Sequence, residues 1–300
     1  MDIWILIIVL LGITSIILCL IRSEYEREKL VVSSYEIEAP KLSKEWDGFT
    51  MAVLADLHDH SFGENNRELI RTIDSIYPDC ILIAGDMLVV KEWKKQDMSV
   101  PFSLLETLSK EYPIYYGNGN HEQRMREEKE KYSGWYEQYE KKLKELNINH
   151  LQNEGVILEK GTSKVAIYGV DIDKKFYKKG KKVPMDNNYI ENQIGPANKE
   201  VFNILLAHTP LYVEQYEHWG ADLVFSGHFH GGTIRLPKLG GIMSPQCQFF
   251  TKRDKGIVSY GKVKMVVSGG LGTHSINIRL NNLPEVVVVR LKCKRNTKNE

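Results

Sequence analysis

Metal-binding side chains follow five short apolar segments of this chain. The motifs, in order, are Asp56-Leu57-His58, Gly85-Asp86, Gly119-Asn120-His121-Glu122, His208 and Gly227-His228-Phe229-His230. Carboxylate, amide and imidazole groups bind divalent metal ions, and Asp and Asn are rare inside strands. Alternation along an extended segment places Asp56 beside His58, and His228 beside His230, on one side of the chain. The combination predicts a metal site.

Each motif alone has a simpler explanation. An Asp-x-His sequence is usually a surface turn, and Gly-Asp after a strand is common in turns and at helix starts. His208, which precedes Thr-Pro, is compatible with the start of a helix. Five such motifs in order, each after an apolar segment, are much harder to explain as turns. The prediction therefore rests on the set and not on any single member.

Alternating strands and helices are needed to bring these residues together. In an α/β sheet, loops at the carboxyl ends of the strands converge on one crevice. Apolar runs predict strands at Met51–Leu54, Cys80–Ala84, Pro113–Tyr116, Val165–Val170, Asn203–Ala207, Leu223–Ser226, Met265–Ser268 and Val286–Leu291, with an edge strand at Val31–Ile37. Helical patterns cover Asn65–Ile76, Glu122–Leu146 and Leu211–Trp219. We expect one α/β domain, residues 31–300.

An uncharged apolar segment, Ile3–Ile21, precedes this domain. A helix of that length measures about 28 Å, close to the hydrocarbon thickness of a bilayer. No Lys or Arg precedes the segment and no A-x-A-like site follows it, which argues against a cleaved signal peptide. A buried core helix is rarely so uniformly apolar. We expect a membrane anchor over residues 1–22 and a charged linker over residues 23–30.

Charge and cysteine content exclude some classes of protein. The chain has 40 Lys and Arg against 39 Asp and Glu, a net charge of +1, whereas nucleic-acid-binding proteins usually carry a basic excess. The four cysteines fall in no paired spacing, so we expect no disulfide framework. Positive charges at Arg22, Arg27 and Lys29 follow the apolar segment and favour a cytoplasmic domain.

The five motifs resemble those of the calcineurin-like metallophosphoesterases, in the same order from Asp56 to His230. The phrases GHFHGGTIRLP, SGGLGTHSINIR and LPEVVVVRL extend the likeness towards the C-terminus. They are similar to membrane-anchored bacterial members, some of which resemble enzymes that cleave UDP-2,3-diacylglucosamine. The resemblance implies a four-layer α-β-β-α sandwich of two mixed sheets after one transmembrane helix, in a bacterial cell membrane.

The same resemblance assigns roles to the motif residues. It implies two metal ions, the first held by Asp56, His58 and His230, the second by Asn120, His208 and His228, with Asp86 bridging both. His121 would face the substrate as general acid or hydrogen-bond donor, and Glu122 would orient it or cap the next helix. Nitrogen and oxygen ligands without cysteine suit Mn²⁺, Fe or Zn²⁺. Such ions lower the pKa of water and so supply hydroxide at neutral pH.

Three further residues are candidate substrate contacts. His60 follows the first motif, Asp171 follows a predicted strand, and Arg279 lies near His274 in the C-terminal phrase. Alternatively, His60 faces solvent, Asp171 belongs to a turn, and Arg279 forms a structural ion pair. At Val89 the family often has Asp or Asn, which implies altered loop support without the loss of a metal ligand.

These features predict a hydrolase of a phosphodiester or pyrophosphate, acting on a membrane-associated or lipid-linked substrate. One alternative is a non-catalytic membrane scaffold, which would be expected to lack ligands, yet none is substituted. Another is a nuclease or nucleotide phosphodiesterase, which the near-zero net charge disfavours. A metallo-β-lactamase-type site is excluded because His58-Asp59-His60 is not followed by the Asp-His pair it needs. The lysine-rich segment between residues 174 and 182 is either a solvated loop or a surface that contacts an anionic bilayer.

Overall fold

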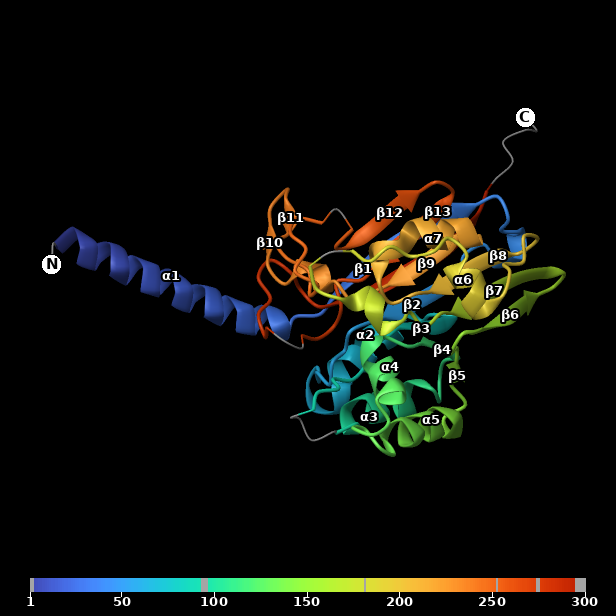
Figure 1. Ribbon diagram of the computed structural model, residues 1–300, viewed down its shortest axis with the longest axis horizontal. Helices are drawn as coiled ribbons and strands as arrows, with labels where there is room; N and C mark the ends of the chain where they lie inside the picture. Colours follow the sequence, from blue (N-terminus) through green and yellow to red (C-terminus); the bar gives the residue numbers. More distant parts are fainter. Residues whose placement is uncertain (1–2, 93–96, 181, 252, 274–275, 295–300) are drawn as a thin grey trace.

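Two six-stranded sheets pack face to face in the computed structural model, which describes residues 3–92, 97–180, 182–251, 253–273 and 276–294 (Figure 1). The first sheet has the order β1 (Val31–Ala39), β14 (Glu285–Cys293), β2 (Thr50–Leu54), β3 (Cys80–Ala84), β4 (Ile114–Gly117) and β5 (Asn149–His150). The second has the order β12 (Gly256–Tyr260), β13 (Val263–Val267), β9 (Leu223–Ser226), β8 (Phe202–Leu206), β7 (Ser163–Gly169) and β6 (Glu154–Lys160). Both sheets combine parallel and antiparallel pairs, as predicted.

Helices cover the outer face of each sheet. Side chains of α2 (Arg67–Ile76), α3 (Ser99–Leu108), α4 (Asn120–Glu127) and α5 (Trp135–Glu145) join the apolar cluster on the first sheet. The second sheet is covered by α6 (Tyr189–Ile194) and α7 (Val213–Trp219). The result is the expected four-layer arrangement, with a short hairpin of β10 (Arg235–Leu236) and β11 (Gly240–Gly241) at one end.

Central strands are buried on both faces, which explains their continuous apolar sequences. In β2, Met51 and Val53 face the second sheet, while Ala52 and Leu54 face the helices. The space between the sheets is filled by aliphatic and aromatic residues from both, including Phe225 of β9. This rigid core fixes the positions of the loops that follow each strand.

One predicted helix is wrong. We expected a single helix over Glu122–Leu146, whereas α4 ends at Glu127 and α5 begins at Trp135. Residues 128–134 separate the two helices, and Gly134, directly before α5, has a φ of +77°, a left-handed conformation that glycine adopts readily. The predicted edge strand is confirmed, because β1 is the terminal strand of its sheet.

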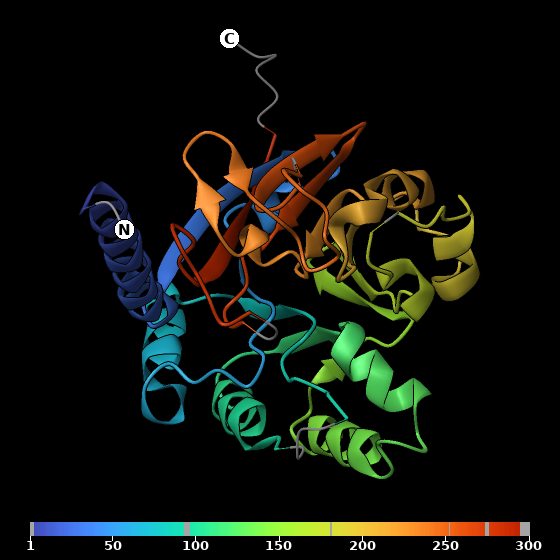
Figure 2. The same ribbon diagram turned by 60° about the vertical axis from the view of Figure 1, so that its left-hand side comes forward.

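The apolar segment forms α1 (Ile3–Arg27), which projects away from the body of the protein (Figures 1 and 2). It is long and apolar enough to cross a membrane, and a signal sequence has the same two properties. The helix continues through the first five residues of the expected linker. Its last turns contact the domain: the Arg279 amide donates to Ser23 Oγ at 3.0 Å, and the Asn282 amide to Glu26 Oε2 at 3.1 Å.

Candidate metal centre

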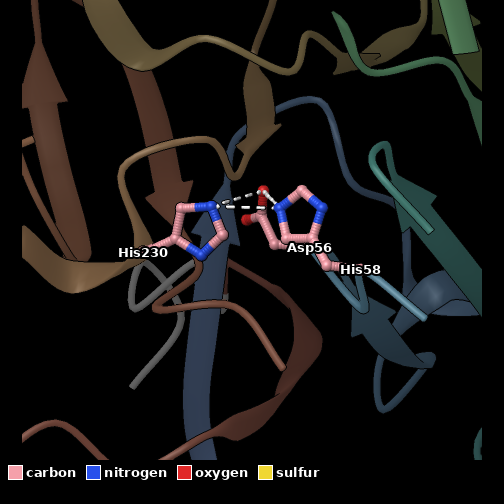
Figure 3. Close-up of side chains that lie close together, drawn as sticks. All are labelled: Asp56, His58 and His230. Atoms are coloured by element: carbon pink, nitrogen blue, oxygen red, sulfur yellow. Dashed lines mark hydrogen bonds and ion pairs between the residues drawn. The ribbon is translucent and has the colours of Figure 1, made fainter. Parts of the chain in front are cut away.

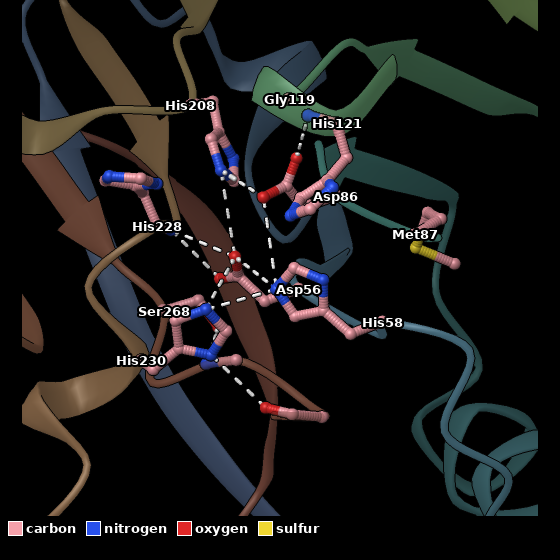
Figure 4. A network of polar contacts seen from close by, with 12 residues as sticks. Asp56, His58, Asp86, Met87, Gly119, His121, His208, His228, His230 and Ser268 are labelled. Atoms are coloured by element: carbon pink, nitrogen blue, oxygen red, sulfur yellow. Dashed lines mark hydrogen bonds and ion pairs between the residues drawn. The ribbon is translucent and has the colours of Figure 1, made fainter. Parts of the chain in front are cut away.

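The five motifs meet at one edge of the two sheets (Figure 4). Asp56 and Asp86 follow the parallel neighbours β2 and β3, and α4 begins directly after β4. His208 and His228 follow β8 and β9 of the second sheet. The site is therefore built from both sheets, at the carboxyl ends of their strands, as the sequence predicted.

Asp56, His58 and His230 form a first group of potential ligands (Figure 3). Asp56 Oδ1 lies 3.6 Å from His58 Nε2 and 3.5 Å from His230 Nε2, and the two imidazole nitrogens are 3.1 Å apart. All three residues are buried. These residues come from the first and last motifs, and they are the set predicted to hold the first metal ion.

Asp86, His208 and His228 form a second group. His208 Nε2 lies 3.1 Å from Asp86 Oδ2, and His208 Nδ1 contacts the Ala84 carbonyl oxygen at 2.6 Å. Asn120 lies beside this group and lines the same cavity as His228. Its Oδ1 atom is buried and has no hydrogen-bond partner among the residues that the structure describes. An unsatisfied buried acceptor beside these groups suits a cation.

Asp86 lies between the two groups. Its Oδ2 atom is 3.1 Å from His208 Nε2 and 3.9 Å from His58 Nε2, one residue from each predicted ligand set. Its Oδ1 atom accepts a hydrogen bond from the His121 amide at 2.8 Å. A carboxylate that bridges two metal ions needs this location.

Electrostatics in the site favour bound cations. Burial alone would raise the pKa of Asp86, but the neighbouring His208 and His121 hold it well below its usual range. Burial likewise opposes a charge on His208, yet Asp86 raises its pKa to about 10. Burial raises the pKa of Asp56, which His230 and His208 lower in part. The histidines thus offset the negative charge of the buried carboxylates, as divalent ions bound at the same place would.

Backbone strain is concentrated at this site. Left-handed φ angles occur at five of the predicted ligands: Asp56 (52°), His58 (51°), Asp86 (56°), His228 (66°) and His230 (49°). Such conformations cost about 1–3 kcal/mol each in non-glycine residues and persist only where the surroundings enforce them. Gly119 shows how closely these loops approach, because a Cβ atom there would lie 2.2 Å from Asp86 Oδ1.

His121 faces a cavity of about 460 Å³ that is also lined by Asn120, His228 and His230. Its Nδ1 atom accepts a hydrogen bond from the Val90 amide at 2.8 Å. A neutral imidazole that accepts at Nδ1 carries its proton on Nε2. His121 also lies close enough to His58 and Asp86 to form a third potential ligand group.

Glu122 joins the loops that carry the site. It accepts hydrogen bonds from the Gly119, Asp86 and Met87 amides and from the Tyr116 hydroxyl, at 2.9–3.0 Å. The bond from Gly119 caps the start of α4, which is one of the two roles expected for this residue. Burial, followed by the charge of Asp86, raises its pKa to about 7.

The three candidate substrate contacts have protein partners. His60 Nε2 lies 3.4 Å from Glu28 Oε1, and Asp171 Oδ2 accepts from Arg126 at 2.6 Å. Arg279 borders the cavity, but its guanidinium donates to four backbone carbonyls, those of Gly269, Gly270, Gly272 and Asn282. A structural role accounts for these contacts, and substrate contact stays a prediction. His274 lies outside the described residues.

The sequence analysis missed several residues of the cavity wall, among them Tyr177 and Arg124. The ring of Tyr177 packs edge-on against His228 with centroids 4.9 Å apart, and Arg124 donates to the Val90 carbonyl next to His121. Tyr177 follows Phe176 among the lysines of residues 174–182, and this aromatic pair is the feature of the sequence that could have identified it. Nothing in the sequence around Arg124 distinguishes it from other charged residues on a helix.

Comparisons with known proteins agree with this geometry. The chain is 26% identical over 233 residues to the uncharacterized metallophosphoesterase YkoQ of Bacillus subtilis, covering 78% of this chain and 80% of the relative. It is 26% identical to the phosphodiesterase YaeI of Escherichia coli, covering 81% and 82%. A shorter match, 30% identical, joins 31% of this chain to 30% of the UDP-2,3-diacylglucosamine pyrophosphatase LpxG of Chlamydia muridarum.

The family model of the calcineurin-like phosphoesterases matches residues 49–232, which is more than half of the chain and includes all five motifs. Buried carboxylates, imidazoles and one amide oxygen converge in the structure from those motifs. The chain therefore belongs to the calcineurin-like phosphoesterase family and is a metallophosphoesterase.

Proposed function

We propose that this metallophosphoesterase hydrolyses a phosphodiester or pyrophosphate bond in a membrane-associated or lipid-linked substrate. The observation that carries the proposal is the position of Asp86 between two ligand groups, beside a cavity large enough for a phosphate ester. Ligand pockets of this kind have volumes of about 300–1,000 Å³. The cavity is lined by apolar residues as well as basic ones, which suits an amphiphilic substrate.

Two divalent cations fit the residues present. Asp56, His58 and His230 would hold one, Asn120, His208 and His228 the other, and Asp86 would contact both. Nitrogen and oxygen donors without cysteine suit Mn²⁺, Fe or Zn²⁺. Bound ions would act as Lewis acids and would lower the pKa of water towards neutral pH.

The remaining chemistry belongs to side chains of the cavity. His121 carries a proton on Nε2, in position to donate to a phosphate oxygen or to the leaving group. Lys91, Arg124 and Lys174 also line the cavity and bring positive charge to an anionic substrate. The Val90 amide fixes the orientation of His121, so the donor is positioned before substrate arrives.

Membrane association is the second part of the proposal. The exposed apolar helix α1 supports an anchor over residues 1–22, with residues 23–30 joining it to the domain of residues 31–300. Arg22, Arg27 and Lys29 favour a cytoplasmic domain on a single-pass protein of the bacterial cell membrane. The similarity to LpxG, a UDP-2,3-diacylglucosamine pyrophosphatase, supports a lipid-linked substrate for this chain.

Metal-dependent turnover tests this function. The full chain in detergent is stripped of metal, resupplied with Mn²⁺ and assayed with bis(4-nitrophenyl) phosphate and with 4-nitrophenyl phosphate. We expect turnover that requires the metal and is lost in Asp86→Asn, with the diester cleaved faster. A chain that neither binds Mn²⁺ nor cleaves either ester would support the scaffold alternative and contradict the proposal.

A further inference from the structure

Exposed apolar side chains gather at one end of the domain. Outside α1, they include Leu236, Leu239, Phe249, Phe250 and Ile276, which are 37–64% exposed. Single exposed apolar residues are ordinary, whereas a contiguous group of large ones marks a surface that binds something. We call Leu236, Leu239, Phe249 and Phe250 the hairpin surface, because they lie on and beside the β10–β11 hairpin.

The hairpin surface adjoins the end of the apolar helix. Arg22 Nη2 donates to Asn281 Oδ1 at 2.7 Å, and Asn281 Nδ2 donates to the Arg235 carbonyl at 3.1 Å. Arg235 is the first residue of β10, so two hydrogen bonds connect α1 to the hairpin. Both ribbon views place the hairpin on the side of the domain from which α1 projects (Figures 1 and 2).

The same chain segment also forms a wall of the cavity. Met243, Ser244, Pro245, Gln246 and Cys247 line it, and Met243 pairs with Phe249 through an antiparallel bridge. The Phe250 amide donates to the Ile242 carbonyl at 3.0 Å, which fixes the two phenylalanines to this wall. Ile276 borders the cavity and is half exposed. The hairpin surface and the cavity wall are thus parts of one folded segment.

The chemistry of the hairpin surface matches the interfacial region of a bilayer. Large aliphatic and aromatic side chains enter the boundary between headgroups and acyl chains, and adjacent basic residues attract anionic lipids. Lys238 is exposed between Leu236 and Leu239, and Arg22 lies directly after the uncharged part of α1. A protein partner would not explain why this group lies beside the one helix suited to a membrane among the described residues.

We propose that the hairpin surface rests in the interface of the bilayer that holds α1, so that the cavity opens at the level of the lipid headgroups. The substrate would then be an amphiphile whose phosphate ester lies at headgroup level and reaches the metal centre without leaving the membrane. This inference rests on the membrane anchoring proposed above, but it assigns a second, independent contact with lipid.

Lipid contact is measurable on the full chain in vesicles of phosphatidylcholine and phosphatidylglycerol. In a background with Cys19, Cys247 and Cys293 replaced by Ser, Leu239→Cys and Phe249→Cys are labelled with an environment-sensitive fluorophore. Quenching by lipids with a nitroxide on the acyl chain reports contact. Leu10→Cys in α1 is the positive control, and Ile157→Cys is the matched control, because Ile157 is about as exposed but lies on β6 at the opposite end of the domain (Figure 1).

The expected result is several-fold stronger quenching at positions 239 and 249 than at 157. If position 10 is quenched but positions 239 and 249 are quenched no more than position 157, the proposed lipid contact of the hairpin surface is wrong and the anchor stands. Absence of quenching at all four positions would overturn both. Turnover of soluble bis(4-nitrophenyl) phosphate by each labelled protein shows separately whether the hydrolase function stands.

A functional test uses the triple variant Leu239→Ser/Phe249→Ser/Phe250→Ser, whose residues do not line the cavity. We expect unchanged turnover of the soluble diester and a several-fold loss with 4-nitrophenyl hexadecyl phosphate embedded in the same vesicles. Equal effects on the two substrates, or none on either, would overturn the delivery of substrate from the bilayer.

Discussion

Several of the predicted metal ligands have backbone conformations that non-glycine residues rarely adopt. Asp56, Asp86 and His230, among others, have left-handed φ angles, and the close approach of Gly119 to Asp86 leaves no room for a Cβ atom. Residue type and spacing were enough to predict which side chains meet. Their strained backbone and the tautomer of His121 were not predictable, because both depend on loops that come from different strands.

His121 has a defined role that mutation can separate from metal binding. In His121→Ala the Nε2 proton donor is lost, so we expect kcat to fall about 10²–10⁴-fold, the usual contribution of a positioned proton donor. Metal content should be unchanged, since the predicted ligands remain. Steady-state kinetics and metal analysis on the same sample check both. A variant that loses a metal ion would instead place His121 among the ligands, as its proximity to His58 and Asp86 permits.

We expect His150 to make the stability of the protein depend on pH. Burial, with Arg126 nearby, lowers its pKa to about 4, and its Nε2 atom contacts Asn118 Oδ1 at 2.8 Å. The unfolded chain, with a histidine pKa of about 6.5, takes up this proton first as the pH falls, so stability present above pH 6.5 is lost towards pH 4, by about 3 kcal/mol.

His150→Gln keeps an amide donor for Asn118 and does not titrate. Chemical unfolding at several pH values should therefore show a smaller loss of stability on acidification in this variant than in the wild type. Parallel pH profiles for the two proteins would contradict the assignment.

At the level of elements, apolar patterning located the central strands and the edge strand β1. It failed where local sequence is ambiguous. The charged segment from Glu122 to Leu146 has helical composition throughout, yet residues 128–134 are not helical and separate α4 from α5. Helix α3 was missed although it is largely apolar, and β5 and the β10–β11 hairpin are two-residue strands defined by their partners. Such elements depend on tertiary contacts, which the apolar periodicity of the sequence does not predict.

The end of α1 packs against the phosphoesterase domain. Glu26 is buried and accepts from the Asn282 amide, and the Asn282 side chain donates to the carbonyl of the predicted metal ligand His230 at 2.6 Å. Glu26→Ala leaves a buried donor unsatisfied, so we expect a loss of about 1–3 kcal/mol in stability and weaker metal binding.

Glu24→Ala is the control, because Glu24 is exposed and its pair with Arg27 should contribute about 0–1 kcal/mol. Thermal unfolding of the full chain in one detergent, with and without Mn²⁺, compares the two variants. Similar shifts in both would show that the end of α1 is not coupled to the centre.

For the whole molecule, the metal centre joins the two sheets. Asp56 and Asp86 follow strands of the first sheet and His208 and His228 follow strands of the second, so ions bound between them would cross-link the halves of the sandwich. The family was identifiable from five short motifs because those motifs supply the chemistry. The packing of α1 against the C-terminal loops was not predictable, because Ser23 and Glu26 resemble ordinary residues of a charged linker.

Anomalous scattering from crystals soaked in Mn²⁺ tests the central claim most directly. We predict two peaks about 3.5–4 Å apart, with Asp86 between them, Asp56, His58 and His230 around one, and Asn120, His208 and His228 around the other. A single peak, or none at a concentration that supports hydrolysis, would contradict a two-metal centre in this protein.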